Sequence, residues 1–386
     1  MKRVSETLTV VLFCVLIASL SIAFVLLPDR DFSPQENRNL ASFPEPGIDR
    51  FFSGAFGEEM NVYFADQFPL RDAFVMLKGG TELGLLRGEN NGVLYRYDQL
   101  AVKDFDAYKS ILETTKDTDR SYADSIRAQL DSLARFGEGA KIPVVTLIPP
   151  RTIDVSDGLF RFQYERPDGD LLYDLAAATL TDAAGYVDTL SLLREKFEAG
   201  EYVYYRTDHH WTTLGAYYAY REVMKALGKE DVILPREAFS IEQSEAFSGT
   251  TAARGGFPVY KKDVLELWRL PDDGAYEVIA DGEELDGFYA RDYLSKSDKY
   301  SVFLDGTHNL TTIKKQGEDR ETLLVAKDSF ANCLLPFLAR EYDIVAVNLH
   351  TVTALTAAAE AYGADAILIV CNGENLITTG DLGKIK

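Results

Sequence analysis

The sequence predicts an α/β protein in which helices flank a parallel sheet, and the C-terminal part of the chain carries the main evidence. Three apolar runs at residues 322–326, 343–347 and 366–370 alternate with helical patterns at 329–340 and 353–362. Strands without polar alternation are typical of a sheet buried on both faces, and strand–helix–strand connections of this kind give right-handed, parallel crossovers. A long apolar run near the N-terminus adds one predicted transmembrane helix to this fold.

The N-terminal run covers 20 uncharged residues, 8–27, which is enough for a helix to cross the hydrocarbon core of a membrane. Lys2 and Arg3 precede it, so the positive-inside rule places the N-terminus in the cytoplasm and the rest of the chain outside. A cleaved signal peptide is the alternative, because Ser21-Ile22-Ala23 offers small residues for a cleavage site. The length of the apolar run favours an anchor, which we assign to residues 1–27.

Two further regions are expected between the anchor and the C-terminus. Residues 28–95 begin with a proline-rich stretch and continue with a helical pattern, which indicates a juxtamembrane arm and a helical segment. Residues 96–386 form the main domain, with an insertion at about 235–320, where Gly, Asp and Pro separate many short aromatic and β-branched runs. Additional elements expected in this domain are strands at 142–148, 186–189 and 202–205 and helices at 119–136 and 213–226.

Charge and cysteine content exclude several classes of protein. The formal net charge of −21 argues against nucleic-acid binding, which requires a basic surface for phosphate contacts. The three cysteines, at positions 14, 333 and 371, do not form a disulfide framework and have no spacing typical of zinc ligands. No pattern in the chain calls for a cofactor. The hydrophobic fraction of 46% supports a sizeable folded core.

Polar residues follow each of the three C-terminal strands, where open parallel sheets form their binding sites. Lys327-Asp328-Ser329 follows the first strand, Asn348 the second and Asn372 the third. Ser329 begins a predicted helix, so its backbone N–H and the positive helix end can stabilise an oxyanion. A catalytic serine also needs a base; without one, this junction is simply a capped helix start.

The segment Thr207-Asp208-His209-His210-Trp211-Thr212 offers that base. Asp208 and His210 are two residues apart, so in an extended or turning segment they project to the same side while His209 points away. Asp208 can then hold Nδ1 of His210 and leave Nε2 to take the proton of Ser329. A metal site on the two histidines is the alternative; it would need further ligands, and we expect no metal.

These motifs resemble those of the DHHW family, which is named for the tetrapeptide present here at 208–211. Through that family the chain is similar to the SGNH-hydrolase-like domains of alginate O-acetyltransferases. The resemblance implies an SGNH-hydrolase-like α/β fold over most of the chain and a catalytic triad of Asp208, His210 and Ser329. Beside the anchor and the triad, it rests on Glu36-Asn37-Arg38, Asp66-Gln67-Phe68-Pro69-Leu70-Arg71, Pro149-Pro150-Arg151 and Lys327-Asp328-Ser329-Phe330.

The resemblance also suggests supporting residues. Asn372 stands where SGNH enzymes place an oxyanion asparagine, and the backbone of Gly306 is a second oxyanion candidate. Arg151 and Trp211 are candidate substrate-binding residues; we expect the Trp211 indole to pack under the motif, with stacking on a sugar ring as the alternative. Lys327 replaces the glycine that usually precedes Asp-Ser, which can crowd the nucleophile turn.

The expected function is that of a membrane-anchored, extracytoplasmic O-acetyltransferase or esterase that acts on a cell-envelope or secreted polysaccharide through an acyl-serine. The resemblance implies an acyl donor supplied by a membrane-bound O-acyltransferase. The alternative is a catalytically inactive scaffold or binding module of a polysaccharide assembly complex. A hydrogen bond between Ser329 and His210 favours the enzyme, whereas distant side chains favour the scaffold.

Overall fold

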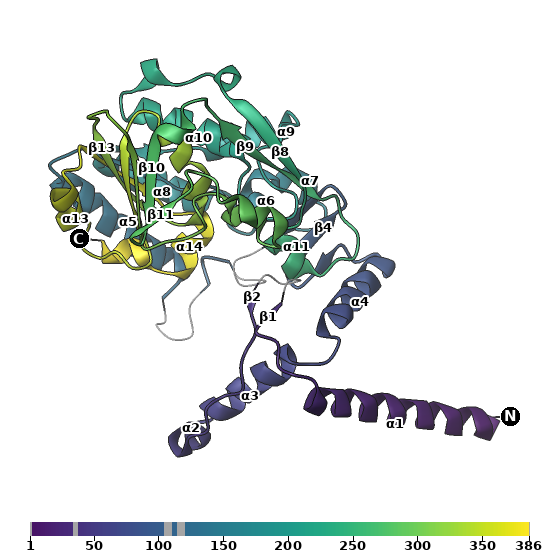
Figure 1. Ribbon diagram of the computed structural model, residues 1–386. Coiled ribbons are helices and arrows are strands. Elements are labelled where there is room, and N and C mark those ends of the chain that lie inside the picture. The colour runs from purple at the N-terminus through teal and green to yellow at the C-terminus, as the bar shows by residue number, and fades with distance from the viewer. Residues whose placement is uncertain (1, 34–37, 104–109, 114–119, 386) are drawn as a thin grey trace. The chain divides into compact units, whose positions relative to one another are not determined.

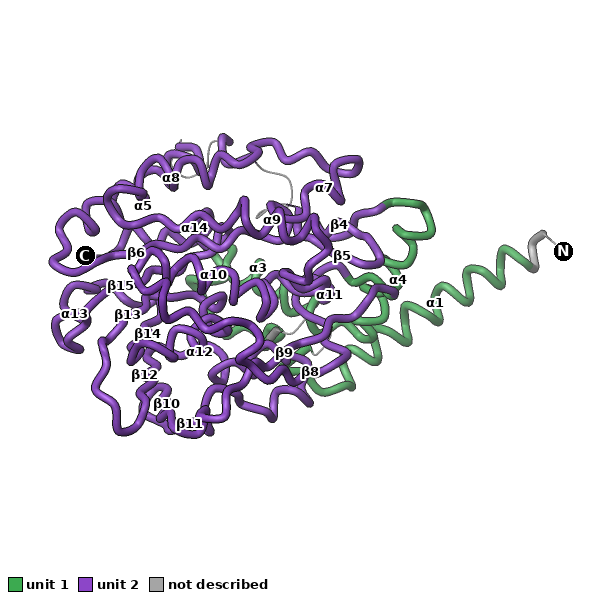
Figure 2. The backbone as a smooth tube through the Cα atoms, turned by 90° about the horizontal axis from the view of Figure 1, so that it is seen from above, with its two compact units in different colours: residues 1–87, 256–258 green, residues 88–255, 259–386 purple. Residues whose placement is uncertain are grey.

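Two compact units make up the protein, and the computed structural model describes residues 2–33, 38–103, 110–113 and 120–385. Figure 2 distinguishes unit 1, residues 1–87 and 256–258, from unit 2, residues 88–255 and 259–386. The motif residues Glu36 and Asn37 and the expected helix start at Asp119 lie outside the described residues. The domain boundary expected near residue 95 stays a prediction.

Unit 1 begins with the apolar helix α1 (Lys2–Leu26). Its stretch Ser5–Leu26 is long and apolar enough to span a membrane. Phe24, near the end of α1, packs against Phe64 of α3 with ring centroids 5.4 Å apart. The remaining elements are β1 (Phe32–Ser33), β2 (Arg38–Asn39), α2 (Ile48–Ser53), α3 (Ala55–Asp66) and α4 (Arg71–Gly84).

An eight-stranded sheet forms the centre of unit 2. Its strands in spatial order are β11 (Glu283–Leu285), β10 (Tyr276–Ala280), β12 (Leu310–Lys315), β14 (Asp343–Asn348), β13 (Thr322–Lys327), β15 (Ala366–Val370), β6 (Val144–Leu147) and β7 (Tyr186–Val187). The five strands from β14 to β7 run parallel, and β12, β10 and β11 extend the sheet in antiparallel pairing. The interior residues of the three C-terminal strands are buried, which confirms the predicted parallel sheet.

The expected insertion supplies the antiparallel edge of this sheet and a separate hairpin. The hairpin consists of β8 (Ser240–Phe247) and β9 (Asp263–Arg269). Outside the insertion, a small three-stranded sheet consists of β3 (Glu89–Asn90), β4 (Val93–Arg96) and β5 (Gln99–Val102). The sheet is flanked by helices, as Figure 1 shows, and the predicted α/β class is therefore confirmed.

Side-chain N-caps mark the starts of α5 and α10 in unit 2. The N-cap Ser121 accepts the Asp124 N–H at the start of α5, and Thr212 accepts the Gly215 N–H at the start of α10. The α-helices are α5 (Tyr122–Gly139), α6 (Thr152–Val155), α7 (Asp157–Phe160), α8 (Leu171–Ala184), α9 (Leu190–Glu198), α10 (Thr213–Ala226), α11 (Thr250–Gly255), α12 (Leu335–Leu338), α13 (Leu355–Tyr362) and α14 (Gly373–Thr378). The 3₁₀ helices are η1 (Glu230–Val232), η2 (Arg236–Ala238), η3 (Asp273–Ala275), η4 (Arg291–Ser295), η5 (Lys299–Val302), η6 (Ser329–Cys333) and η7 (Asp381–Lys384).

Two predicted elements differ from the structure. The single helix expected at 329–340 is split into η6 and α12. Pro336 explains the split, because proline lacks an N–H and its ring clashes with the carbonyl four residues earlier, whereas it fits the first turn of a new helix. The strand expected at 202–205 is reduced to an isolated bridge between Tyr204 and Trp211.

Candidate active site

Ser329 lies directly after β13, at the first position of η6. Asp328 fixes this turn, because its Oδ1 accepts the Phe330 N–H at 3.0 Å. Its Oδ2 accepts the backbone N–H of Asn372 at 2.6 Å and the side-chain Nδ2 of the same residue at 2.7 Å. Burial raises the pKa of Asp328, and these donors oppose that effect. Since Asn372 follows β15, Asp328 ties the ends of two neighbouring parallel strands together next to Ser329.

His210 and Asp208 complete a hydrogen-bonded chain with Ser329. His210 Nε2 lies 2.8 Å from Ser329 Oγ, and His210 Nδ1 lies 2.6 Å from Asp208 Oδ1. The same Oδ1 accepts the backbone N–H of His210 at 3.0 Å. Asp208 and His210 are only 2% and 5% exposed. This geometry lets Nε2 receive the serine proton while the carboxylate holds Nδ1–H.

The second carboxylate oxygen of Asp208 is held by Thr250, the first residue of α11. Oδ2 accepts the Thr250 N–H at 2.9 Å and the Thr250 hydroxyl at 3.0 Å. Gly249 permits this close approach, since a Cβ at its position would lie 2.3 Å from Asp208 Oδ2. Burial alone would raise the pKa of Asp208, but His209, His210 and the hydrogen-bond donors hold that pKa below its usual value. The carboxylate therefore stays ionised at neutral pH.

Aromatic side chains fix the plane of the His210 ring. Tyr300 stacks on it with ring centroids 3.8 Å apart and an interplanar angle of 8°, and Phe330 packs with its centroid 4.8 Å away. Trp211 is fully buried, and its Nε1–H donates to the Phe330 carbonyl at 3.0 Å. The indole therefore packs under the motif, as expected, and the alternative in which Trp211 binds substrate by stacking on a sugar is wrong.

His209 lies beside His210 and does not point to the opposite side of the segment. The two imidazole centroids are 3.8 Å apart. The expected opposite projection is wrong because residues 206–210 form a series of bends instead of an extended strand. His209 Nδ1 lies 2.7 Å from Thr250 Oγ1, and burial together with the neighbouring His210 lowers the pKa of His209. His209 is thus a neutral residue that braces Thr250 at the edge of the site.

The donor atoms of Asp208, His209 and His210 lie within 4.8 Å of one another, an arrangement that can hold a metal ion. Most of these metal-ligating atoms already form hydrogen bonds within the protein. Asp208 Oδ1 accepts two hydrogen bonds from His210, Asp208 Oδ2 accepts two from Thr250, and His209 Nδ1 is bonded to the Thr250 hydroxyl. This bonding pattern suits a catalytic triad better than a metal centre.

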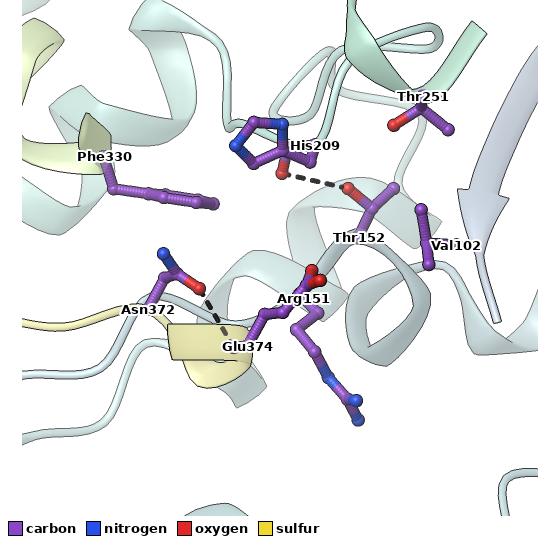
Figure 3. Close-up of a pocket in the computed structure, with 8 residues that line it drawn as sticks. All are labelled: Val102, Arg151, Thr152, His209, Thr251, Phe330, Asn372 and Glu374. Carbon is purple, nitrogen blue, oxygen red and sulfur yellow. Dashed lines mark hydrogen bonds between the residues drawn. The ribbon is translucent and has the colours of Figure 1, made fainter. Parts of the chain in front are cut away.

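A polar cleft of about 860 Å³ opens at Ser329. Its lining includes His209, Thr250, Asn375, Thr378, Ser329 and His350. A narrower pocket shares several of its lining residues with the cleft. In Figure 3, Val102 and Thr251 lie on one side of this narrower pocket, and Phe330 and Asn372 lie on the other. Hydroxyl, amide and imidazole groups, together with the charged side chains of Arg254 and Glu374, thus line the cleft of the nucleophile candidate.

The expected oxyanion residues have different outcomes. Asn372 lines both the cleft and the narrower pocket. Its Nδ2 carries two hydrogens; one is donated to Asp328, and the second is left for a ligand. The Gly306 N–H, in contrast, donates to the Phe303 carbonyl at 3.1 Å. Gly306 therefore has no free backbone donor to offer, and its assignment as an oxyanion residue is corrected.

Arg151 lines the narrower pocket, but its guanidinium pairs with Asp154 through two hydrogen bonds of 2.8 Å. The Asp154 side chain is fully buried, and Figure 3 shows the guanidinium directed away from His209. This pairing indicates a structural role in place of the expected substrate contact. Lys327 does not crowd the nucleophile turn; its buried Nζ donates to the Asn332 side chain within η6.

Sequence reasoning missed Thr250, Tyr300 and the hydrogen bond between the cleft residue His350 and Asp381. Thr250 and Tyr300 come from the irregular insertion, where no periodicity indicates which residues face inward. His350 follows β14 much as Ser329 follows β13, and this position in the sequence could have indicated that His350 lies at the same edge of the sheet. Asp381 is an isolated carboxylate near the C-terminus, and the sequence offers no sign of its partner.

The comparisons with known proteins agree with this fold. The model of the DHHW protein family matches residues 119–348. Among solved structures, a DHHW family protein from Eubacterium siraeum DSM 15702 is 19% identical, with 75% of this chain and 96% of that chain covered and a TM-score of 0.57. Bacillus cereus PatB1 with a sulfonyl adduct is 15% identical, with coverages of 76% and 100% and a TM-score of 0.59.

A third solved structure, the O-acetyltransferase domain of Pseudomonas putida AlgJ, is 15% identical, with coverages of 76% and 95% and a TM-score of 0.46. The search of curated proteins gave no match. At these identities the likenesses concern the fold, which is the predicted SGNH-hydrolase-like α/β fold.

Proposed function

This chain belongs to the DHHW family, and from that premise we propose that it is an acyl-transfer enzyme that forms an acyl-serine on Ser329. The observation that carries the proposal is the hydrogen-bonded chain from Ser329 Oγ through His210 to Asp208, with distances of 2.8 and 2.6 Å. A Ser-His-Asp triad is recognised by this geometry and by the roles of its members, because the same arrangement serves acyl transfer on unrelated folds.

In the first half-reaction, His210 Nε2 removes the proton from Ser329 Oγ while that oxygen attacks the acyl carbonyl carbon. Ionised Asp208 stabilises the imidazolium that forms. The imidazolium then protonates the leaving group, the bond between the acyl carbon and the leaving group breaks, and the acyl-serine remains. In the second half-reaction, the acceptor hydroxyl gives its proton to Nε2 and attacks the ester carbon, and Ser329 Oγ recovers the proton as it leaves.

The negative charge on the acyl oxygen needs donors near Ser329 in both half-reactions. The backbone N–H of Ser329 has no hydrogen-bond partner among the described residues and is our first candidate. The second Nδ2 hydrogen of Asn372 is the other. Asp328 holds Asn372 in place by accepting hydrogen bonds from its backbone and its side chain.

The proposed substrates are an acetyl donor and a cell-envelope or secreted polysaccharide. The hydroxyl-, amide- and imidazole-lined cleft supports a hydroxyl-rich acceptor. Helix α1 anchors the protein, and Lys2 and Arg3 keep its N-terminus in the cytoplasm, so the domain meets envelope glycans outside. A membrane-bound O-acyltransferase is the proposed source of the acetyl group, and hydrolysis of the acyl-serine makes the enzyme an esterase when no acceptor is bound.

Ester turnover by the full-length protein tests this function. Purified wild type should release nitrophenol from p-nitrophenyl acetate, and Ser329→Ala and His210→Ala should each lose this activity. His308→Gln is the control, because His308 contacts Asp281 and Asp305 away from the cleft. Equal rates for wild type and Ser329→Ala would contradict the triad and favour the inactive scaffold. Activity that is lost on chelation and restored by a divalent metal would favour the metal site.

A further inference from the structure

We propose that His350, held by Asp381, binds a hydroxyl group of the acceptor glycan that neighbours the attacking hydroxyl. The inference rests on the proposed acyl transfer and concerns the choice between a sugar and water as acceptor. His350 plays no part in the triad described above, yet it lines the same cleft as Ser329.

Sheet register places His350 and Ser329 just beyond the ends of two neighbouring strands. In the parallel pairing of β13 with β14, Lys327 lies opposite Asn348, so Ser329 and His350 each come two residues after an aligned pair. The Leu349 N–H also donates to the Lys327 carbonyl at 2.9 Å, which continues the pairing beyond the strand ends. Neighbouring strands are about 4.8 Å apart. The two side chains therefore project from adjacent strand ends into one cleft.

Hydrogen bonds orient the His350 imidazole. Its Nδ1 bonds Oδ2 of Asp381, whose side chain is 3% exposed, and Lys384 Nζ holds the other carboxylate oxygen at 2.6 Å. The backbone N–H of His350 donates to Asn348 Oδ1 at 3.0 Å. Because the carboxylate engages Nδ1, Nε2 is the ring nitrogen that remains for a hydrogen bond with a hydroxyl group of a ligand. The His350 side chain is 44% exposed, so this nitrogen is open to a ligand.

The division of roles follows from the contacts of the two imidazoles. His210 is hydrogen-bonded to Ser329 Oγ and therefore serves as the base for the attacking hydroxyl. His350 approaches the cleft from the next strand and meets a different hydroxyl of the same acceptor. Asn375 and Thr378, from α14, add an amide and a hydroxyl group to the cleft lining. Water has no second hydroxyl to bind, so this subsite favours a polyhydroxylated acceptor such as a sugar with adjacent hydroxyls.

A partition experiment with two acceptors tests the proposal. The full-length protein is acylated with p-nitrophenyl acetate in the presence of methyl β-glucoside or methanol, and the acetate transferred to each acceptor is compared with the acetate released to water. Methanol has a single hydroxyl and is the chemical control. We expect the wild type to transfer more acetate to the glucoside than to methanol at equal concentration, because only the glucoside occupies the His350 subsite.

His350→Ala should lower the glucoside-to-methanol ratio about tenfold, through a raised apparent KM for the glucoside. His350→Gln keeps an acceptor oxygen and should restore part of the ratio, and Asp381→Asn should lower it because the imidazole is no longer held in one orientation. The matched control His308→Gln, at an acid-flanked histidine outside the cleft lining, should keep the wild-type ratio.

A wild-type enzyme with no preference for the glucoside, or a ratio unchanged in His350→Ala, overturns the proposed subsite. Absence of any nitrophenol release from the wild type has a different meaning, because it contradicts the acyl-transfer function itself. A loss of all activity in His350→Ala together with its melting transition would assign the pair a structural role, and Asp381→Asn with a normal melting transition and the wild-type ratio would do the same.

Discussion

The substitution Lys327→Met removes a buried amine from the strand end that carries Ser329. The Lys327 side chain is 2% exposed and donates to Asn332. Burial lowers the pKa of Lys327 from 10.5 to about 8, although the neighbouring Asp328 opposes this. At about 1.36 kcal/mol for each pKa unit, this difference corresponds to about 3 kcal/mol of folding free energy that depends on pH.

The sign follows from proton counting. Between pH 8 and 10.5 the unfolded chain binds the lysine proton and the folded chain does not, so the free energy of unfolding of the wild type rises with pH across this window. Below pH 8 both states are protonated and the full cost of the buried charge is present. Methionine does not titrate, and its variant lacks this contribution.

Urea unfolding of both proteins, followed by tryptophan fluorescence from neutral pH to pH 10.5, measures the effect. The unfolding free energy of the wild type minus that of Lys327→Met should increase by about 3 kcal/mol over this range. Lys141→Met, at a side chain that is 90% exposed, is the control and should show no such change. Parallel profiles for wild type and Lys327→Met would refute the reasoning, because they would mean that burial does not penalise the Lys327 charge.

Three further predictions concern the site. Asp208→Asn should lower kcat for p-nitrophenyl acetate roughly 10³- to 10⁴-fold, because an amide cannot hold the His210 tautomer or stabilise the imidazolium; a loss of only a few-fold would contradict that role. Gly249→Ala should abolish activity and lower the free energy of unfolding by roughly 1–3 kcal/mol, because its methyl group would overlap Asp208 Oδ2. Calorimetry measures the loss of stability, and a variant as stable as the wild type would disprove this contact. Cys333 should resist iodoacetamide in the folded protein and react in urea, because burial raises the pKa of its thiol to about 12. Peptide mass spectrometry measures the modification. Rapid modification of the folded protein would contradict the prediction, because it would show that the thiol is accessible.

Strand-level features of the fold could be predicted from the sequence because they depend on local pattern. The apolar runs now seen as β13, β14 and β15 have no polar alternation, and only a sheet covered on both faces accommodates that pattern. Parallel strands in turn bring their carboxyl ends to one edge. Ser329 and Asn372 could therefore be placed near each other, and the structure joins them through Asp328.

Features that depend on local backbone geometry were harder to predict. The relation of Asp208 to His210 follows from a spacing of two residues in an extended segment, but the segment bends and places His209 next to His210 as well. Periodicity alone also hides the effect of one proline, since Pro336 splits an otherwise regular helical pattern into two short helices.

Contacts from the insertion could not be predicted at all. Thr250 and Tyr300 reach the triad from residues 235–320, where short runs and turns give no register. Their positions depend on long-range packing of a hairpin and several 3₁₀ helices. The pairing of His350 with Asp381 likewise joins a strand end to a short C-terminal helix across 31 positions of sequence.

Mass spectrometry of the acyl-enzyme tests the central claim most directly. The full-length protein is mixed with p-nitrophenyl acetate, quenched in acid within the first turnover and digested, and the peptide that contains Ser329 is sequenced. The account predicts one acetyl group on Ser329 in the wild type and none in Ser329→Ala. An acetyl group on another residue, or ester turnover without any adduct on Ser329, would contradict the account.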